Sequence, residues 1–158
     1  MKNKIFIAVD TKSPKKAKSI IAKSKLKNFK IGYKFGLEFL NTKNGRNFIS
    51  RLKNKIIFAD LKLHDIPNTM SSTVIALKDL KINYLTVHIS SGIKALKAVK
   101  KVSGKIKIVG VTTLTSLDNK DLISIGHKKT LKEIVILQSK LARRAKLDAV
   151  VCSPQEVK

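Results

Sequence analysis

Two acids and a base follow one apolar segment of the chain. Residues 56–59 are typical of a buried strand, and Asp60, Lys62 and Asp65 come directly after them. Because strand residues two apart face the same side, Asp60 and Lys62 should point the same way. Pro67 suits the first turn of a following helix. A fixed cation between carboxylates can stabilise developing negative charge, so this strand end is a candidate active site.

An ordinary surface ion pair is the competing interpretation of these residues. An exposed Asp–Lys pair at a strand end contributes about 0–1 kcal/mol and needs no function. The chain holds only 10 acidic residues against 34 basic ones, yet two of the acids lie between positions 60 and 65. That concentration favours a functional site.

Strand and helix patterns alternate along the whole chain. Strands are expected at residues 5–9, 29–32, 56–61, 84–88, 106–111 and 148–152, and helices at about 14–24, 37–40, 48–52, 67–80, 93–102 and 131–145. This alternation is typical of a parallel α/β fold. No glycine-rich G-x-G-x-x-G turn follows the first strand, so a dinucleotide-binding Rossmann domain is poorly supported.

Polar residues are expected at the carboxyl end of nearly every strand. The candidates are Asp10, Lys30, Asp60 with Lys62, His88 and Thr115. In a (β/α)8 barrel this face carries the active site. We therefore predict an α/β, TIM-type (β/α)8 barrel, with residues 1–158 forming one domain that covers about the first six strands and lacks the last two βα units.

The segment from Asp60 to Thr69 reads Asp-x-Lys-x-His-Asp-Ile-Pro-Asn-Thr. It closely resembles the signature of the orotidine 5'-monophosphate (OMP) decarboxylase family. Further segments resemble other strand ends of that family, namely residues 9–10, 29–32, 87–92, 111–116 and 150–156.

The resemblance implies a role for each charged residue. Lys62 would protonate C6 of the pyrimidine as CO2 departs, and Asp60 would lie against the substrate carboxylate. Lys30 and Asp65 would complete an alternating chain of charges, with Asp65 reaching into the site of a dimer partner.

The remaining implied roles concern substrate binding. Asp10 would bind the ribose hydroxyls and Thr115 the pyrimidine ring, while the segment through Thr69 would contact the pyrimidine and the phosphate. That segment comprises Ile66, Pro67, Asn68 and Thr69.

The same resemblance implies conversion of OMP to UMP and CO2 in de novo pyrimidine biosynthesis, without cofactor or metal. It also implies a cytoplasmic homodimer whose small-molecule partner is the nucleotide. The phosphate-binding Pro-Gly-x-Arg loop and Gly-Arg turn of the family have no counterpart here. We therefore expect this chain alone to bind the nucleotide weakly and to turn over little.

Three alternatives remain open. A metal-dependent sugar-phosphate decarboxylase or aldolase of the same superfamily would need a further acid near the second strand, for which Glu38 is the nearest candidate. An inactive fragment is another possibility. A nucleic-acid-binding domain is suggested by the net charge of +24.

The composition argues against the nucleic-acid alternative. Lysines are spread along the whole length, and two Tyr and no Trp are present for stacking on bases.

The single cysteine, Cys152, is expected to be a small buried residue, and His64 and His88 are expected to be structural. No apolar run has membrane-spanning length, and the N-terminus does not resemble a signal peptide.

Overall fold

A computed structural model describes residues 4–24 and 26–153. The chain divides into two compact units. Unit 1 comprises Met1–Leu61 and Ala76–Leu85, and unit 2 comprises Lys62–Ile75 and Thr86–Lys158. The prediction of one domain over residues 1–158 stays a prediction.

Six strands follow one another in the sheet in their order along the chain. Strands β1 and β2 pair in parallel, as do β2 with β3 and β5 with β6. The predicted number of strands is confirmed. Their bounds are β1 Lys4–Ala8, β2 Lys30–Gly36, β3 Ile56–Leu63, β4 Tyr84–His88, β5 Lys107–Val111 and β6 Ala149–Val151.

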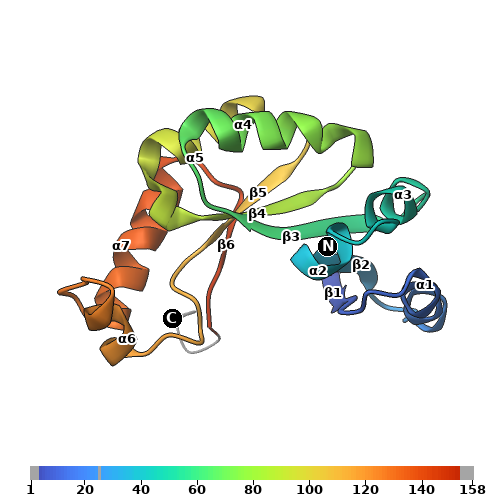
Figure 1. Ribbon diagram of the computed structural model, residues 1–158, viewed down its shortest axis with the longest axis horizontal. Helices are drawn as coiled ribbons and strands as arrows, with labels where there is room; N and C mark the ends of the chain where they lie inside the picture. Colours follow the sequence, from blue (N-terminus) through green and yellow to red (C-terminus); the bar gives the residue numbers. More distant parts are fainter. Residues whose placement is uncertain (1–3, 25, 154–158) are drawn as a thin grey trace. The chain divides into compact units, whose positions relative to one another are not determined.

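Helices occupy the connections between the strands (Figure 1). The helix predicted over residues 67–80 is two pieces, an α-helix and a separate 3-10 turn, and the connection after β5 contains a short helix that the prediction missed. The bounds are α1 Pro14–Lys23, α2 Leu37–Leu40, α3 Gly45–Ser50, α4 Pro67–Ala76, η1 Lys78–Leu80, η2 Ile89–Ser91, α5 Gly92–Val102, α6 Asn119–Ser124 and α7 Leu131–Arg144.

Local signals explain where several helices begin. Ser13 caps α1, its hydroxyl accepting a hydrogen bond from the Lys16 backbone N–H at 3.3 Å, and Pro14 occupies the first helical position. Helix α7 begins with a reciprocal capping box between Thr130 and Glu133.

The two faces of the sheet in unit 1 differ in character. Phe35 is fully buried on one face and packs against Phe39 of α2 with ring centroids 5.0 Å apart. On the other face, Phe6 of β1 packs edge-to-face against Phe58 of β3 at 5.1 Å. These two rings meet across Gly32 of β2, where an added Cβ would lie 2.5 Å from the Phe6 ring.

The core of unit 2 is formed by α5, α7 and the strands beside them. The fully buried side chains include Leu96 and Val99 of α5 and Ile108 of β5. Asp148, just before β6, accepts a hydrogen bond from the Ile108 N–H at 2.8 Å and forms an ion pair with Lys100 of α5. This carboxylate therefore links the start of β6 to both β5 and α5.

Within residues 4–24 and 26–153, no helix is both long enough and apolar enough to cross a bilayer.

Candidate active site

One charged contact of unit 1 joins two neighbouring strands. Lys34 of β2 donates from Nζ to Asp60 Oδ2 of β3 at 2.9 Å. Asp60 is only 8% exposed, so this carboxylate is held largely out of water. A buried carboxylate needs a charged or hydrogen-bonding partner, and Lys34 supplies one.

The strand register explains why these two side chains meet. Asp60 pairs with Gly36, and Lys34 is two residues before Gly36 on the same strand. Residues two apart share a face, and paired residues on neighbouring strands also share one, so Lys34 reaches Asp60 diagonally. Phe58 lies on this same face, because it is two residues before Asp60 on β3 and pairs with Lys34. The ion pair therefore lies on the sheet face that holds the Phe6–Phe58 contact.

Asp10 lies just past the end of β1 and is exposed. The Val9 N–H donates to the Lys34 carbonyl at 2.9 Å, so β1 and β2 stay joined up to this point. Asp10 therefore follows the carboxyl end of β1, as predicted. Its predicted contact with a ribose stays a prediction.

The predicted position of Lys30 is wrong. Strand β2 begins at Lys30 and ends at Gly36, so Lys30 lies at the amino end of the strand, paired with Lys4. The strand continues because Tyr33 and Phe35 extend the alternation of buried side chains beyond Gly32. The lysine that contacts Asp60 is Lys34, which the sequence interpretation missed, although the run Ile31, Tyr33 and Phe35 carried the signal for the longer strand.

Lys62 in unit 2 has an unusual backbone. Its φ is +49°, in the left-handed region that residues with a side chain rarely adopt, although it lies inside β3. Its N–H donates to Thr86 Oγ1 of β4 at 2.8 Å. The regular alternation of side chains between the two faces of a sheet is interrupted at a residue with positive φ. The prediction that Asp60 and Lys62 point the same way therefore stays a prediction.

The segment after β3 leads directly into a helix. The Asp65 carboxylate accepts a hydrogen bond from the Ile66 N–H at 2.6 Å, and the Met70 N–H donates to the Ile66 carbonyl as α4 begins. The predicted helix start at Pro67 is confirmed. Asp65 and the next four residues, which are also expected to bind substrate, are all exposed, namely Ile66, Pro67, Asn68 and Thr69.

The other predicted strand-end residues of unit 2 lie where the strands of that unit end. His88 is the last residue of β4, and its ring lies 5.3 Å from that of the exposed His64. Thr115 is exposed in the segment that follows β5. Of the segment 150–156, residues 154–156 lie outside the part of the chain that the structure describes.

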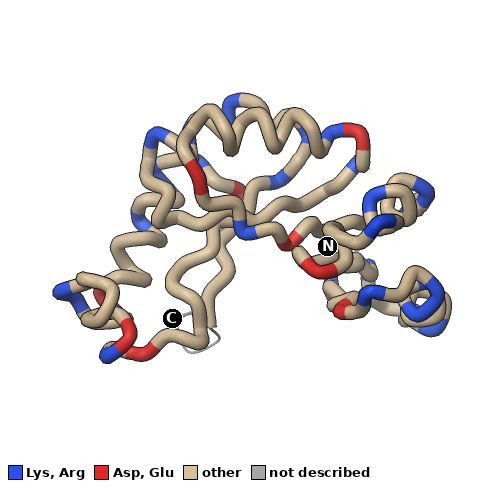
Figure 2. The backbone as a smooth tube through the Cα atoms, in the orientation of Figure 1, with Lys and Arg blue, Asp and Glu red and all other residues tan. Residues whose placement is uncertain are grey.

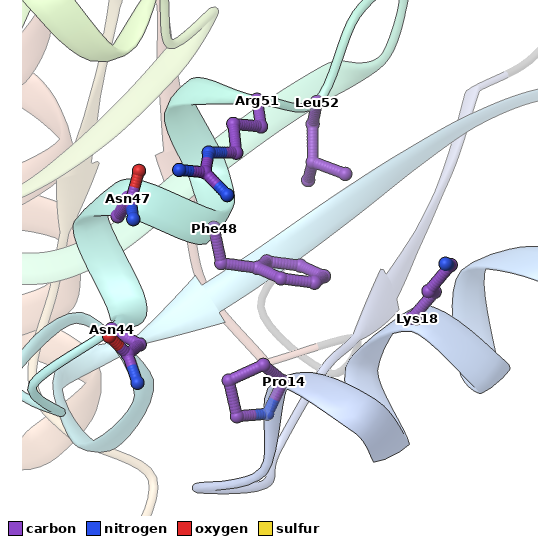
Figure 3. A pocket seen from close by; sticks show the side chains of 7 residues that line it. All are labelled: Pro14, Lys18, Asn44, Asn47, Phe48, Arg51 and Leu52. Carbon is purple, nitrogen blue, oxygen red and sulfur yellow. The ribbon is translucent and has the colours of Figure 1, made fainter.

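A separate cleft of ≈ 540 Å³ lies in unit 1 between α1 and the region of α3 (Figure 3). Phe48 lies at its centre, with Lys18 and Arg51 among the residues around it. None of the predicted site residues lines this cleft. The candidate active site therefore rests on the strand-end residues.

Comparison with known proteins decides the family. The model of the orotidine 5'-phosphate decarboxylase / HUMPS family matches residues 3–158. The chain belongs to this family.

Curated relatives of the chain carry the decarboxylase name. Orotidine 5'-phosphate decarboxylase from Sphingopyxis alaskensis is 42% identical over 161 residues, which cover 100% of this chain and 70% of that protein. The enzyme from Wolbachia pipientis subsp. Culex pipiens is 44% identical over 159 residues, covering 98% of this chain and 69% of that protein. These relatives favour the decarboxylase over the metal-dependent and nucleic-acid-binding alternatives.

Solved structures agree with this assignment. Orotidine 5'-phosphate decarboxylase from Lactobacillus acidophilus has a TM-score of 0.87 and 32% identity, covering 99% of this chain and 74% of that one. The enzyme from Methanocaldococcus jannaschii, complexed with inhibitor BMP, has a TM-score of 0.75 and 26% identity, and the match covers 99% of this chain and 71% of that one. The predicted fold, about the first six strands of a TIM-type (β/α)8 barrel, is confirmed.

Proposed function

We propose that this decarboxylase-family chain is a carboxy-lyase that converts OMP to UMP and CO2. The bond between C6 and the carboxylate carbon breaks, CO2 leaves, and the electron pair stays on C6. Lys62 then transfers an ammonium proton to C6, and the neutral amine regains a proton from solvent. A fixed cation is the main stabilisation available, because no adjacent carbonyl delocalises the charge at C6.

The Lys34–Asp60 ion pair is the observation that carries this proposal. It pairs a largely buried carboxylate with a lysine ammonium group, and this carboxylate lies on the strand that also contains Lys62, two residues further along. We propose that Asp60 lies against the substrate carboxylate and that Lys34, in place of the predicted Lys30, continues the chain of charges. This revision follows from the contact that Lys34 makes.

Substrate binding is assigned to the exposed strand-end residues. Asp10 would accept hydrogen bonds from the ribose hydroxyls, since an ionised carboxylate is an acceptor only. The exposed hydroxyl of Thr115 suits a polar edge of the pyrimidine. Residues Ile66, Pro67, Asn68 and Thr69 would contact the pyrimidine and the phosphate at the start of α4, because the amino end of a helix favours anions.

We further propose that the protein acts in the cytoplasm as a homodimer, with Asp65 entering the site of the partner. The exposure of Asp65 and its neighbours in the single chain supports this assignment. A monomer at working concentration, measured by light scattering, would contradict it.

The reaction is tested by release of labelled CO2 from carboxyl-labelled OMP. We expect Lys62→Ala to lower the rate by at least about 100-fold, the usual scale for loss of a proton-transfer group. Lys97→Ala, at an exposed position of α5, serves as the matched control and should keep the wild-type rate. Equal rates for the two variants would refute the role of Lys62.

EDTA separates this function from the metal-dependent alternative. Glu38, the acid considered for a metal, lies in α2 and pairs with Lys12 at 3.6 Å. We expect the rate of CO2 release to be the same with and without EDTA. Loss of the activity in EDTA, with recovery on adding Mg²⁺, would favour the alternative.

A further inference from the structure

The backbone of Lys62 differs from that of the rest of its strand. Four residues other than glycine have positive φ in the described chain. Lys81 is the C-cap residue of η1, and Lys146 follows the C-cap residue of α7. Asn54 lies in the connection between α3 and β3. Helix ends and connections are usual places for a left-handed residue. Lys62 alone of the four lies inside a strand. Such a conformation persists only where the surroundings hold it, and it occurs most often at functional sites.

One buried side chain holds this backbone. The Lys62 N–H donates to Thr86 Oγ1 at 2.8 Å, whereas a regular parallel ladder would offer a backbone carbonyl. Thr86 is 1% exposed, and both its neighbours in β4, Leu85 and Val87, are fully buried. A branched side chain packed in this way has little rotational freedom, so the position of its hydroxyl is well defined.

We propose that Thr86 is a positioning residue for the reaction, acting through Lys62. The inference rests on the proposed function of Lys62 as proton donor. The hydrogen bond fixes the Lys62 backbone in the left-handed region, and this conformation sets the direction in which the side chain leaves the strand. Because a misplacement of about 1 Å can cost on the order of 100-fold in rate, losing this acceptor should impair proton transfer.

The test compares two substitutions that differ in the acceptor. Thr86→Val keeps the branched shape and removes the hydroxyl, whereas Thr86→Ser keeps the hydroxyl. We expect kcat for CO2 release from OMP to fall about tenfold or more in Thr86→Val, with KM within about threefold of wild type. Thr86→Ser should stay within about threefold of wild type. If the valine variant does not fold, Thr86→Ala takes its place.

A control variant separates positioning from stability. Ser103, before β5, is also buried, and its hydroxyl donates to the Lys100 carbonyl at 3.0 Å. Ser103→Ala should lower the melting temperature about as much as Thr86→Val without lowering kcat. Wild-type kcat in Thr86→Val, or an equal loss of kcat in Thr86→Ser, would overturn the proposal.

A second readout does not depend on decarboxylation. Hydrogen exchange of the Lys62 amide, followed by NMR, should be at least about tenfold faster in Thr86→Val than in Thr86→Ser, because only serine keeps the acceptor. Equal exchange would overturn the role of Thr86 even in an active enzyme. Failure of the wild-type chain to release CO2, with the expected exchange difference present, would instead count against the proposed function alone.

Discussion

At the scale of single residues, the cost of a buried charge determines which lysine matters. Asp60 is almost enclosed, and removing a charged partner of such a carboxylate is costly, because its charge is then less well compensated. Lys34 makes this contact from the same sheet face, whereas Lys30 lies exposed at the other end of β2. The two lysines belong to one strand and differ in whether they reach Asp60, so they form a matched pair.

We expect Lys34→Ala to lower the free energy of unfolding by about 1–3 kcal/mol, because it leaves the Asp60 carboxylate without its ammonium donor. Lys30→Ala should change it by less than about 0.5 kcal/mol, as is usual for an exposed side chain. Urea titrations followed by circular dichroism measure both values. CO2 release from OMP should fall sharply in Lys34→Ala and stay near wild type in Lys30→Ala. The reverse order would show that the ion pair is not the functional contact.

At the scale of elements, helix starts are set by short polar motifs. The Glu133 carboxylate in the first turn of α7 accepts hydrogen bonds from the Thr130 backbone N–H at 2.9 Å and from the Thr130 hydroxyl at 2.8 Å. These two bonds lower the pKa of Glu133 below its ordinary value, and the bond from the Thr130 backbone N–H has the larger effect. The charged form is therefore the one that the folded helix favours.

This lowered pKa predicts a pH dependence with a definite sign. A carboxyl group whose pKa is depressed by folding stabilises the protein above its unfolded pKa of about 4.3, and that stabilisation is lost as the pH falls through the folded value. Glu133→Gln removes the titrating group. We expect wild type to melt at a slightly higher temperature than the variant at pH 6, and the difference to vanish near pH 3. A difference independent of pH would contradict this account.

At the scale of the whole molecule, the dominant feature is positive charge. The net charge is +24, and Figure 2 shows Lys and Arg along helices and connecting segments with few acidic positions between them. Like charges repel each other most strongly in the compact state, so this charge opposes folding. Salt weakens the repulsion by shortening the range of the interaction.

The melting temperature should therefore rise with ionic strength. Raising NaCl from about 10 mM to about 0.15 M shortens the Debye length from about 30 Å to about 8 Å. We expect an increase of several degrees by differential scanning calorimetry, with KCl giving the same result at equal ionic strength. A lower melting temperature at the higher salt concentration would mean that attractive ion pairs outweigh the repulsion.

The sequence alone determined the family and the fold. The alternating apolar patterns predicted six strands with intervening helices, and the segment from Asp60 to Thr69 identified the family, because both signals are local along the chain. The position of Asp10 just past β1 and that of Asp60 in the carboxyl half of β3 follow from the same patterns. No long-range contact is needed for any of these inferences.

Tertiary structure decided which residues the strand-end groups contact. Lys34 meets Asp60 through the register between β2 and β3, and Thr86 meets the backbone of Lys62 from β4. The partners in these contacts are 26 and 24 residues apart in sequence, so no local pattern specifies them. Periodicity places a side chain on a face of a strand, but only the packing of neighbouring strands determines which groups come within hydrogen-bonding distance.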